Sequence, residues 1–204
     1  MADLFITGQF YGVDTITAVS NGSQIMHMMT VIIVGLAMGT TVTIGHSVGA
    51  KCMEQAEKII GNTITLFMGI AVAFTVILVV LVKPIVVLIA TPQEAVAGTS
   101  IYLLICFIGI PFITAYNIIS SIFRGLGDSK SPMYFIGIAC VMNIALDYLF
   151  MGAFHMGAAG AALGTVCAQT FSVLVALWVI RRRKTGISLK KSDFKIETAV
   201  IGQV

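Results

Sequence analysis

Charged side chains are scarce in this sequence. Asp, Glu, Lys and Arg make up 10% of the 204 residues, hydrophobic residues make up 58%, and the mean hydropathy is +1.01. An average soluble domain is about 25% charged. No charged residue occurs in residues 15–50, 59–82 and 95–123, and Asp147 is the only one in residues 131–180. Each run is long enough for a membrane-spanning helix of roughly 20 residues, and the last is long enough for two. These absences exclude a water-soluble globule and predict an integral membrane protein.

Motifs for metals, nucleotides and nucleic acids are also missing. Residues 125–130 (GLGDSK) do not match the GxxxxGK[ST] pattern of a phosphate-binding loop. The basic residues occupy short connectors rather than a folded basic face, so we expect no nucleic-acid partner. Residues 1–3 (MAD) place an acid where a signal peptide has basic residues, so no cleavable signal peptide is expected. The cysteines lack CxxC spacing and a neighbouring His cluster, which argues against a metal or disulfide site. They are Cys52, Cys106, Cys140 and Cys167.

The apolar runs that are present predict an all-α, polytopic bundle of about six transmembrane helices, the first of them truncated. A short apolar piece at residues 4–10 precedes a turn at 11–14, and another apolar stretch begins at 196–204. Pro84 and Pro92 are expected in one loop. The five full helices are expected near residues 20–47, 58–82, 99–122, 131–151 and 158–180.

Two further sequence features concern how these helices begin and pack. Pro132 is expected in the first turn of a helix, where its missing N–H costs nothing. Glycines spaced GxxxG permit close approach of helices in lipid, and we interpret them as packing positions. These pairs are Gly35/Gly39, Gly45/Gly49 and Gly160/Gly164.

The basic residues predict the orientation of the helices. Five full helices place successive connectors on alternating sides of the membrane. One side holds Lys83 alone, and the other holds eleven residues: Lys51, Lys58, Arg124, Lys130, Arg181, Arg182, Arg183, Lys184, Lys190, Lys191 and Lys195. Because cytoplasmic loops carry the excess of Lys and Arg, the eleven are expected in the cytoplasm. This predicts a multi-pass plasma-membrane protein with cytoplasmic loops near 51–57 and 124–130, a cytoplasmic tail after 181, and outer loops near 11–17, 83–98 and 152–157.

Four oxygen-bearing side chains are expected at one depth in the membrane. An ionisable group there is costly and is by default a functional candidate, and Asp147 is the clearest case. Asn143 precedes it by four residues and shares its helix face. Thr165 lies about seven residues into the next helix, which starts from the same outer side, and Asp3 lies about as far before the first outer turn. At 1.5 Å rise per residue, all four lie roughly 5 to 12 Å below the outer boundary. Two carboxylates, an amide and a hydroxyl suit Na⁺ or a proton better than a soft metal. The alternative is that Asp147 only hydrogen-bonds a neighbouring helix.

Four motifs in order resemble the amino-terminal lobe of the multidrug and toxic compound extrusion (MATE) family. They are DLFITG at 3–8, RGLGDSKSP at 124–132, NIALD at 143–147 and GAAGAALGT at 157–165. The resemblance implies one of two six-helix lobes that enclose a central cavity, with an Na⁺ or H⁺ gradient driving export of organic, usually cationic compounds. It also implies a cation site formed by an acid of the first helix, an Asn and Asp of the fifth and a Thr of the sixth. Here these are Asp3, Asn143, Asp147 and Thr165.

The resulting hypothesis is an ion-coupled antiporter lobe rather than an enzyme. Residues 1–180 form the transmembrane lobe, and residues 181–204 form a basic connector and the start of a seventh helix. The second lobe is absent from the sequence, so transport by this chain alone is not expected. The expected partners are small organic substrates, the lipid bilayer and the missing lobe, and no cofactor is expected besides the coupling ion. Two alternatives stay open: a flippase for lipid-linked sugars, which would be expected to carry Lys or Arg within the membrane, and a non-transporting scaffold.

Overall fold

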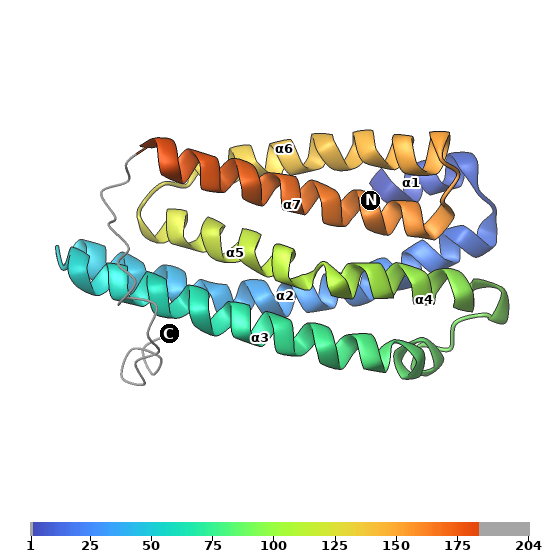
Figure 1. Ribbon diagram of the computed structural model, residues 1–204, viewed down its shortest axis with the longest axis horizontal. Helices are drawn as coiled ribbons and strands as arrows, with labels where there is room; N and C mark the ends of the chain where they lie inside the picture. Colours follow the sequence, from blue (N-terminus) through green and yellow to red (C-terminus); the bar gives the residue numbers. More distant parts are fainter. Residues whose placement is uncertain (1, 184–204) are drawn as a thin grey trace.

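The computed structural model describes residues 2–183, and every element in that part of the chain is helical (Figure 1). In chain order the elements are α1 (Ala2–Phe10), α2 (Val13–Gly49), α3 (Met53–Leu88), α4 (Gln93–Ile108), α5 (Ile110–Gly125), α6 (Lys130–Asp147), the π-helix η1 (Tyr148–Ala153) and α7 (Gly157–Arg183). This confirms the expected all-α fold. The expected helix at 196–204 and most of the basic tail lie outside the described residues.

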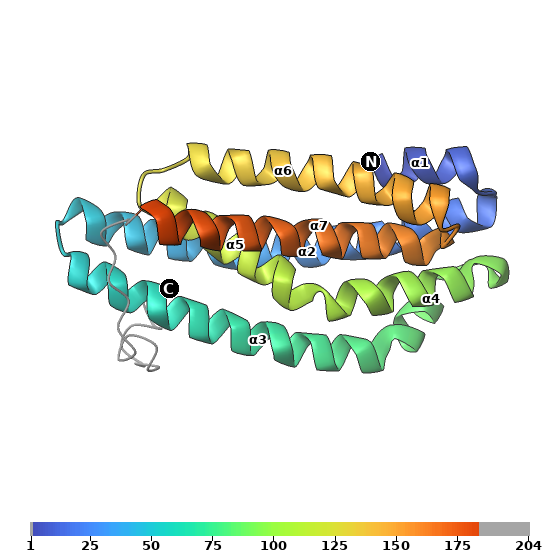
Figure 2. The same cartoon turned by 45° about the horizontal axis from the view of Figure 1, so that its top comes forward.

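The helices run side by side along the long axis of the molecule (Figures 1 and 2). The α7 helix packs against α6 on one side and against α4 and α5 on the other, and α2 packs against α3, α4 and α5. The α2–α3 and α5–α6 connections gather at one end of the bundle together with the end of α7 (Figure 1). The other connections, which join α1 to α2, α3 to α4 and α6 to α7, lie at the opposite end. The predicted cytoplasmic basic residues of the connectors are therefore collected at a single end.

Within residues 2–183, four helices are long and apolar enough to cross a membrane, and the α4–α5 pair makes a fifth span if it is counted as one bent helix. The pair bends by 48° at Gly109. Pro111 follows the bend, and its ring and missing N–H prevent α4 from continuing as a straight helix. The side chain of Val166 from α7 occupies the space where a Cβ at Gly109 would lie. The single helix expected at 99–122 is therefore wrong in its geometry, because the break at Gly109 was not foreseen.

The expected loop at 83–98 is also wrong over its first part, because α3 continues through Pro84 to Leu88. Leu78, Val82 and Val86 recur every four residues and are buried in the same apolar core. This packed stripe extends across Pro84, so tertiary packing maintains the helix despite the proline. Only the short segment 89–92 joins α3 to α4.

The start of α6 is fixed by the carboxylate of Asp128. One carboxylate oxygen, Oδ1, accepts hydrogen bonds from the backbone N–H groups of Lys130 and Ser131 at 3.1 and 3.0 Å, and Oδ2 accepts one from the Ser131 hydroxyl at 2.6 Å. These bonds satisfy amide groups that lack partners within the helix. Pro132 lies in the first turn, as expected. These bonds fix the start of α6, the helix that carries Asn143 and Asp147.

Candidate cation site

The face of α7 that meets α6 is built from small residues, which lets the two helices approach closely. At Gly160, an added Cβ would lie 3.1 Å from the Met151 side chain, and at Gly164 it would collide with the carboxylate of Asp147. Ala161 between them is fully buried. The GxxxG pair at 160 and 164 therefore does more than pack backbones, because Gly164 provides the space that the Asp147 side chain occupies.

Asp147 is the last residue of α6 and is fully buried. Neither of its carboxylate oxygens has a hydrogen-bond partner in acceptable geometry within residues 2–183. The Asp3 carboxylate is close enough to interact with it electrostatically. A buried carboxylate without partners is costly as an anion, so it is stable when it binds a proton or a cation. The side chain thus lies inside the bundle and not toward lipid.

A chain of polar contacts joins the other three candidates. The amide of Asn143 donates to the Thr165 hydroxyl at 3.4 Å. That hydroxyl lies 3.3 Å from a carboxylate oxygen of Asp3 and 3.1 Å from the backbone carbonyl of Ala161. Because a hydroxyl has one hydrogen, it donates to only one of these two oxygens at a time. The structure therefore brings Asp3, Asn143 and Thr165 together from α1, α6 and α7.

These three side chains line a cavity of about 200 Å³. Tyr116 and Gln169 are also part of its wall. The volume is enough for several water molecules of about 30 Å³ each, or for a partly hydrated ion. Asp147 does not line the cavity and instead lies against Gly164 beside it. The two carboxylates therefore differ, since Asp3 faces the cavity and Asp147 is enclosed.

The site residues are hard oxygen donors. In the part of the chain that the structure describes, no group of three or more His, Cys, Asp or Glu side chains could hold a metal ion. Two carboxylates, an amide oxygen and a hydroxyl are the ligands preferred by hard cations, whereas thiolate and imidazole select transition metals. The donor set fits Na⁺ or a proton.

Asp3 is held in place by contacts made further along α1. The ring of Phe10 packs edge-on against Tyr148, with ring centroids 6.1 Å apart, and lies close to Gly152. The Tyr148 hydroxyl donates to the Gln9 side chain at 3.3 Å. Tyr148 and Gly152 both belong to η1, so the π-helix that follows Asp147 forms the surface on which α1 docks. A π-helix within an α-helical span often marks a functional site.

Tyr11 links the turn after α1 to the connection between η1 and α7. Its hydroxyl donates to the backbone carbonyl of Met151 at 3.0 Å and accepts from the N–H of Gly157 at 2.9 Å. Gly157 has φ +58°, a left-handed conformation that suits glycine. Sequence reasoning missed both Tyr11 and Gly164. The GxxxG spacing pointed to Gly164, but no sequence signal indicated that Asp147 would be its neighbour.

Known proteins provide an independent comparison. A family model described as MatE matches residues 1–149. The chain belongs to the MATE family. It is 30% identical over 196 residues to the probable multidrug resistance protein YoeA of Bacillus subtilis, a match that covers 94% of this chain and 42% of YoeA. A solved structure of an inward-facing multidrug resistance MATE transporter superposes with a TM-score of 0.91 at 22% identity, covering 99% of this chain and 46% of that one.

MATE membership confirms the resemblance found in the sequence motifs and makes this chain a multi-pass membrane protein from a family of transporters rather than enzymes. A probable lipid II flippase, MurJ of Synechocystis, is 34% identical over 119 residues, which covers 56% of this chain and 22% of MurJ. The chain spans less than half the length of the curated multidrug relatives that it matches.

Proposed function

We propose that this chain forms one lobe of an antiporter that couples Na⁺ or H⁺ entry to export of organic, mainly cationic compounds. The observation that carries the proposal is the enclosed Asp147 carboxylate, which interacts with Asp3 and has no hydrogen-bond partner in acceptable geometry among the described residues. Asn143 and Thr165 supply the remaining oxygens. A pair of carboxylates in an uncharged setting attracts cations, and it cannot remain doubly ionised without one.

Coupling follows from the different positions of the two carboxylates. Occupation of the site by a monovalent cation would offset one of the two negative charges, reduce their repulsion and favour close packing of α1, α6 and α7 around it. Loss of the ion would leave two charges that repel each other and that favour hydration, and thus separation of α1 from α6. An ion can shift such an equilibrium only by the difference in its affinity for the two arrangements. The cationic compound to be exported would bind to the ion-free arrangement, in which α1 and α6 are separated.

Relatives of about twice this length support the further proposal that transport needs a second lobe. The collected basic end of the bundle supports a cytoplasmic location for that end. The absence of Lys and Arg from residues 59–82, 95–123 and 131–180 disfavours an anionic lipid-linked sugar as cargo, because such a substrate would be bound by cationic groups.

A thermal unfolding experiment tests the ion site directly. The purified chain in detergent is compared in sodium and choline chloride at equal ionic strength. Sodium at 100 times its Kd should stabilise the folded chain by about 2.7 kcal/mol, and Asp147→Asn should abolish that response. Glu94→Gln removes the same charge from the exposed first turn of α4 and should leave it intact.

If the coupling ion is a proton, sodium has no effect. The same variants are then compared across a pH series. Asp147→Asn should remove a pH-dependent component of stability that Glu94→Gln retains. A chain whose stability responds to neither sodium nor pH through Asp147 would contradict the proposal.

A further inference from the structure

A second polar cavity adjoins the candidate cation site. It has a volume of about 140 Å³ and lies between α2, α4, α5 and α7. Tyr102, Asn117 and Thr30 contribute polar groups to its wall. We refer to it as the inner cavity, and to the cavity lined by Asp3 as the carboxylate cavity. Three residues line both cavities: Tyr116, Thr165 and Gln169. These shared residues form the partition between them.

The partition contains polar atoms that the protein itself does not satisfy. The Gln169 side-chain oxygen and the Tyr116 hydroxyl are both buried, and among the described residues neither has a hydrogen-bond partner in acceptable geometry. Tyr116 is 8% exposed. A buried polar atom left unpaired is costly, and water can satisfy it where the space holds at least one molecule and offers two or more polar partners. Both adjoining cavities meet these conditions.

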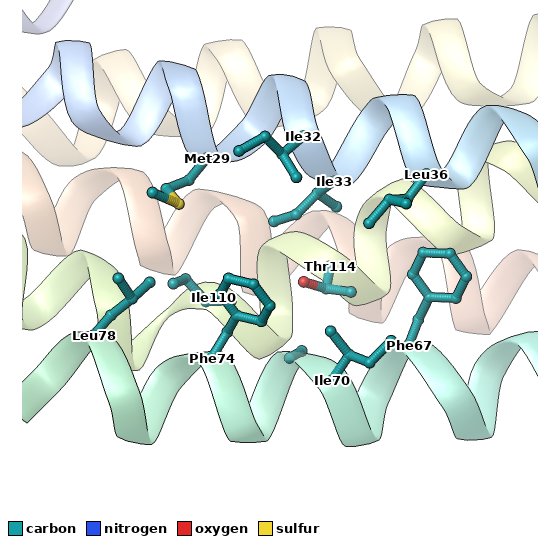
Figure 3. Close-up of a pocket in the computed structure, with 11 residues that line it drawn as sticks. Met29, Ile32, Ile33, Leu36, Phe67, Ile70, Phe74, Leu78, Ile110 and Thr114 are labelled. Carbon is teal, nitrogen blue, oxygen red and sulfur yellow. The ribbon is translucent and has the colours of Figure 1, made fainter.

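A third cavity shows that this polarity is local. It lies between α2, α3 and α5, has a volume of about 40 Å³, and is lined by apolar side chains apart from Thr114 (Figure 3). Such a space is not expected to hold water, because empty apolar cavities stay dry. The two cavities that meet at Gln169 thus have polar groups in their walls that this third cavity lacks.

Gln169 also lies between the two cavities, where a passage that connects them would have to run. It follows Thr165 by four residues on α7, which places it on the same helix face and about 6 Å further from the η1 end. A path from the carboxylate cavity past Gln169 therefore leads into the inner cavity between α2, α4, α5 and α7.

We infer that Tyr116 and Gln169 form a hydrated passage through which a monovalent cation, with its water, moves between the inner cavity and the carboxylate cavity. The inference rests on the proposed function, because it assigns a route to the coupling ion of that site. The hydroxyl and amide replace part of the ion's water shell as it passes. The inner cavity is then a water-filled chamber on the ion route.

The route can be tested in the intact chain by measuring how fast a cation reacts with a single cysteine placed in each cavity. Cys140 lines only the carboxylate cavity, and Asn117 lines only the inner cavity. Two reporters are prepared with the other cysteines replaced by alanine: one retains Cys140, and the other carries Asn117→Cys as its single thiol. The probe is Ag⁺, a monovalent cation that binds thiolates, supplied as the nitrate. The rate of thiol loss is measured for each reporter.

The passage is then altered at Gln169. Gln169→Met keeps the length of the side chain but removes its hydrogen-bonding groups, whereas Gln169→Asn keeps the amide. We expect Gln169→Met to slow the reaction at the Asn117→Cys thiol by about tenfold, the scale of one lost hydrogen bond along the path. Gln169→Asn should change it by less than about twofold, and the Cys140 reaction should be unaffected by either. Tyr116→Phe provides a second variant that removes only the hydroxyl.

Two results would overturn the inference. One is an unreactive Asn117→Cys thiol in a folded chain, and the other is a rate that is equal in the methionine and asparagine variants. Sodium-dependent unfolding is measured on the same samples to separate this inference from the proposed function. Loss of the sodium and pH responses with the thiol rates as expected would refute the ion site and keep the passage. The reverse pattern would refute the passage and keep the site.

Discussion

The carboxylate cavity and the apolar cavity of Figure 3 lie in one helix bundle but differ in the side chains that line them. In the apolar cavity, large side chains such as Phe67, Phe74 and Leu78 fill the space between α2 and α3, and Thr114 is the one polar residue in its lining. Beside the carboxylate cavity, Gly164 of α7 instead leaves the space that Asp147 occupies. An unpaired hydroxyl such as that of Thr114 is a modest cost, whereas an unpaired buried carboxylate is a large one.

The difference indicates where stability has been given up for function. Packing alone would favour large apolar residues on α7, because they fill space without an electrostatic cost. Gly164 and Asp147 instead form a contact that only a small residue permits and that leaves a carboxylate without partners. If the carboxylate site is an ion site, changes there should alter the response to sodium or protons, and changes around the apolar cavity should not.

The largest effect is expected from Gly164→Ala. The new methyl group would collide with the Asp147 carboxylate, so α6 and α7 must separate or the carboxylate must leave its position. We expect destabilisation by about 1–3 kcal/mol, the usual cost of overpacking, together with loss of the response to sodium or pH. Thermal unfolding in both media measures the two effects together.

Gly137→Ala is the matched control for this substitution. It places the same methyl group on α6 at a position where no atom lies within 4 Å. Because alanine favours helix more than glycine does, this variant should be neutral or slightly more stable, with the ion response unchanged. Equal effects of the two substitutions would mean that the close contact at Gly164 has no special role.

An intermediate effect is expected from Tyr11→Phe. The change removes one hydrogen bond to Met151 and leaves the N–H of Gly157 without its partner. The expected loss of stability is about 1–2 kcal/mol. Tyr11 fixes the carboxyl end of α1, and Asp3 lies at the other end of the same short helix. A higher sodium concentration should therefore also be needed for half of the full stabilisation. Tyr134→Phe, which changes an exposed tyrosine of α6, should do neither. An unchanged midpoint in Tyr11→Phe would show that Tyr11 does not position the site.

Much of the site was predictable because depth in a membrane follows from simple geometry. Helix rise, alternating topology and the bounds of the apolar runs are enough to place Asp3, Asn143 and Thr165 at one level, and the structure joins them through the Thr165 hydroxyl. That these residues bind a cation stays a prediction. The side-by-side placement of Asp147 and Gly164 was not predictable, because it depends on how α6 and α7 are rotated against each other.

The parts of the fold that the sequence analysis missed also involve contacts between helices. Pro84 indicated a loop, but burial of Val82 and Val86 keeps the helix intact around it. The bend at Gly109 combines Pro111, which interrupts the helix, with Val166, a residue 57 positions away that occupies the space beside the glycine. The sequence shows the prolines, but periodicity and composition carry no information on the contacts between helices that decide whether the helix continues at Pro84 and what packs against the bend at Gly109.

The smallest effect is expected from replacing a threonine by valine, once in each cavity. The two variants, Thr165→Val and Thr114→Val, also compare the two cavities most directly. Thr165→Val removes a hydroxyl that lies between Asn143 and Asp3, so we expect a loss of about 1 kcal/mol in stability and a weaker sodium or proton response. Thr114→Val removes a buried hydroxyl that has no partner among residues 2–183, so stability should be unchanged or slightly higher. Its ion response should equal that of the parent chain. A weakened response in Thr114→Val, or a normal one in Thr165→Val, would show that the two cavities do not divide packing from ion binding as their linings indicate.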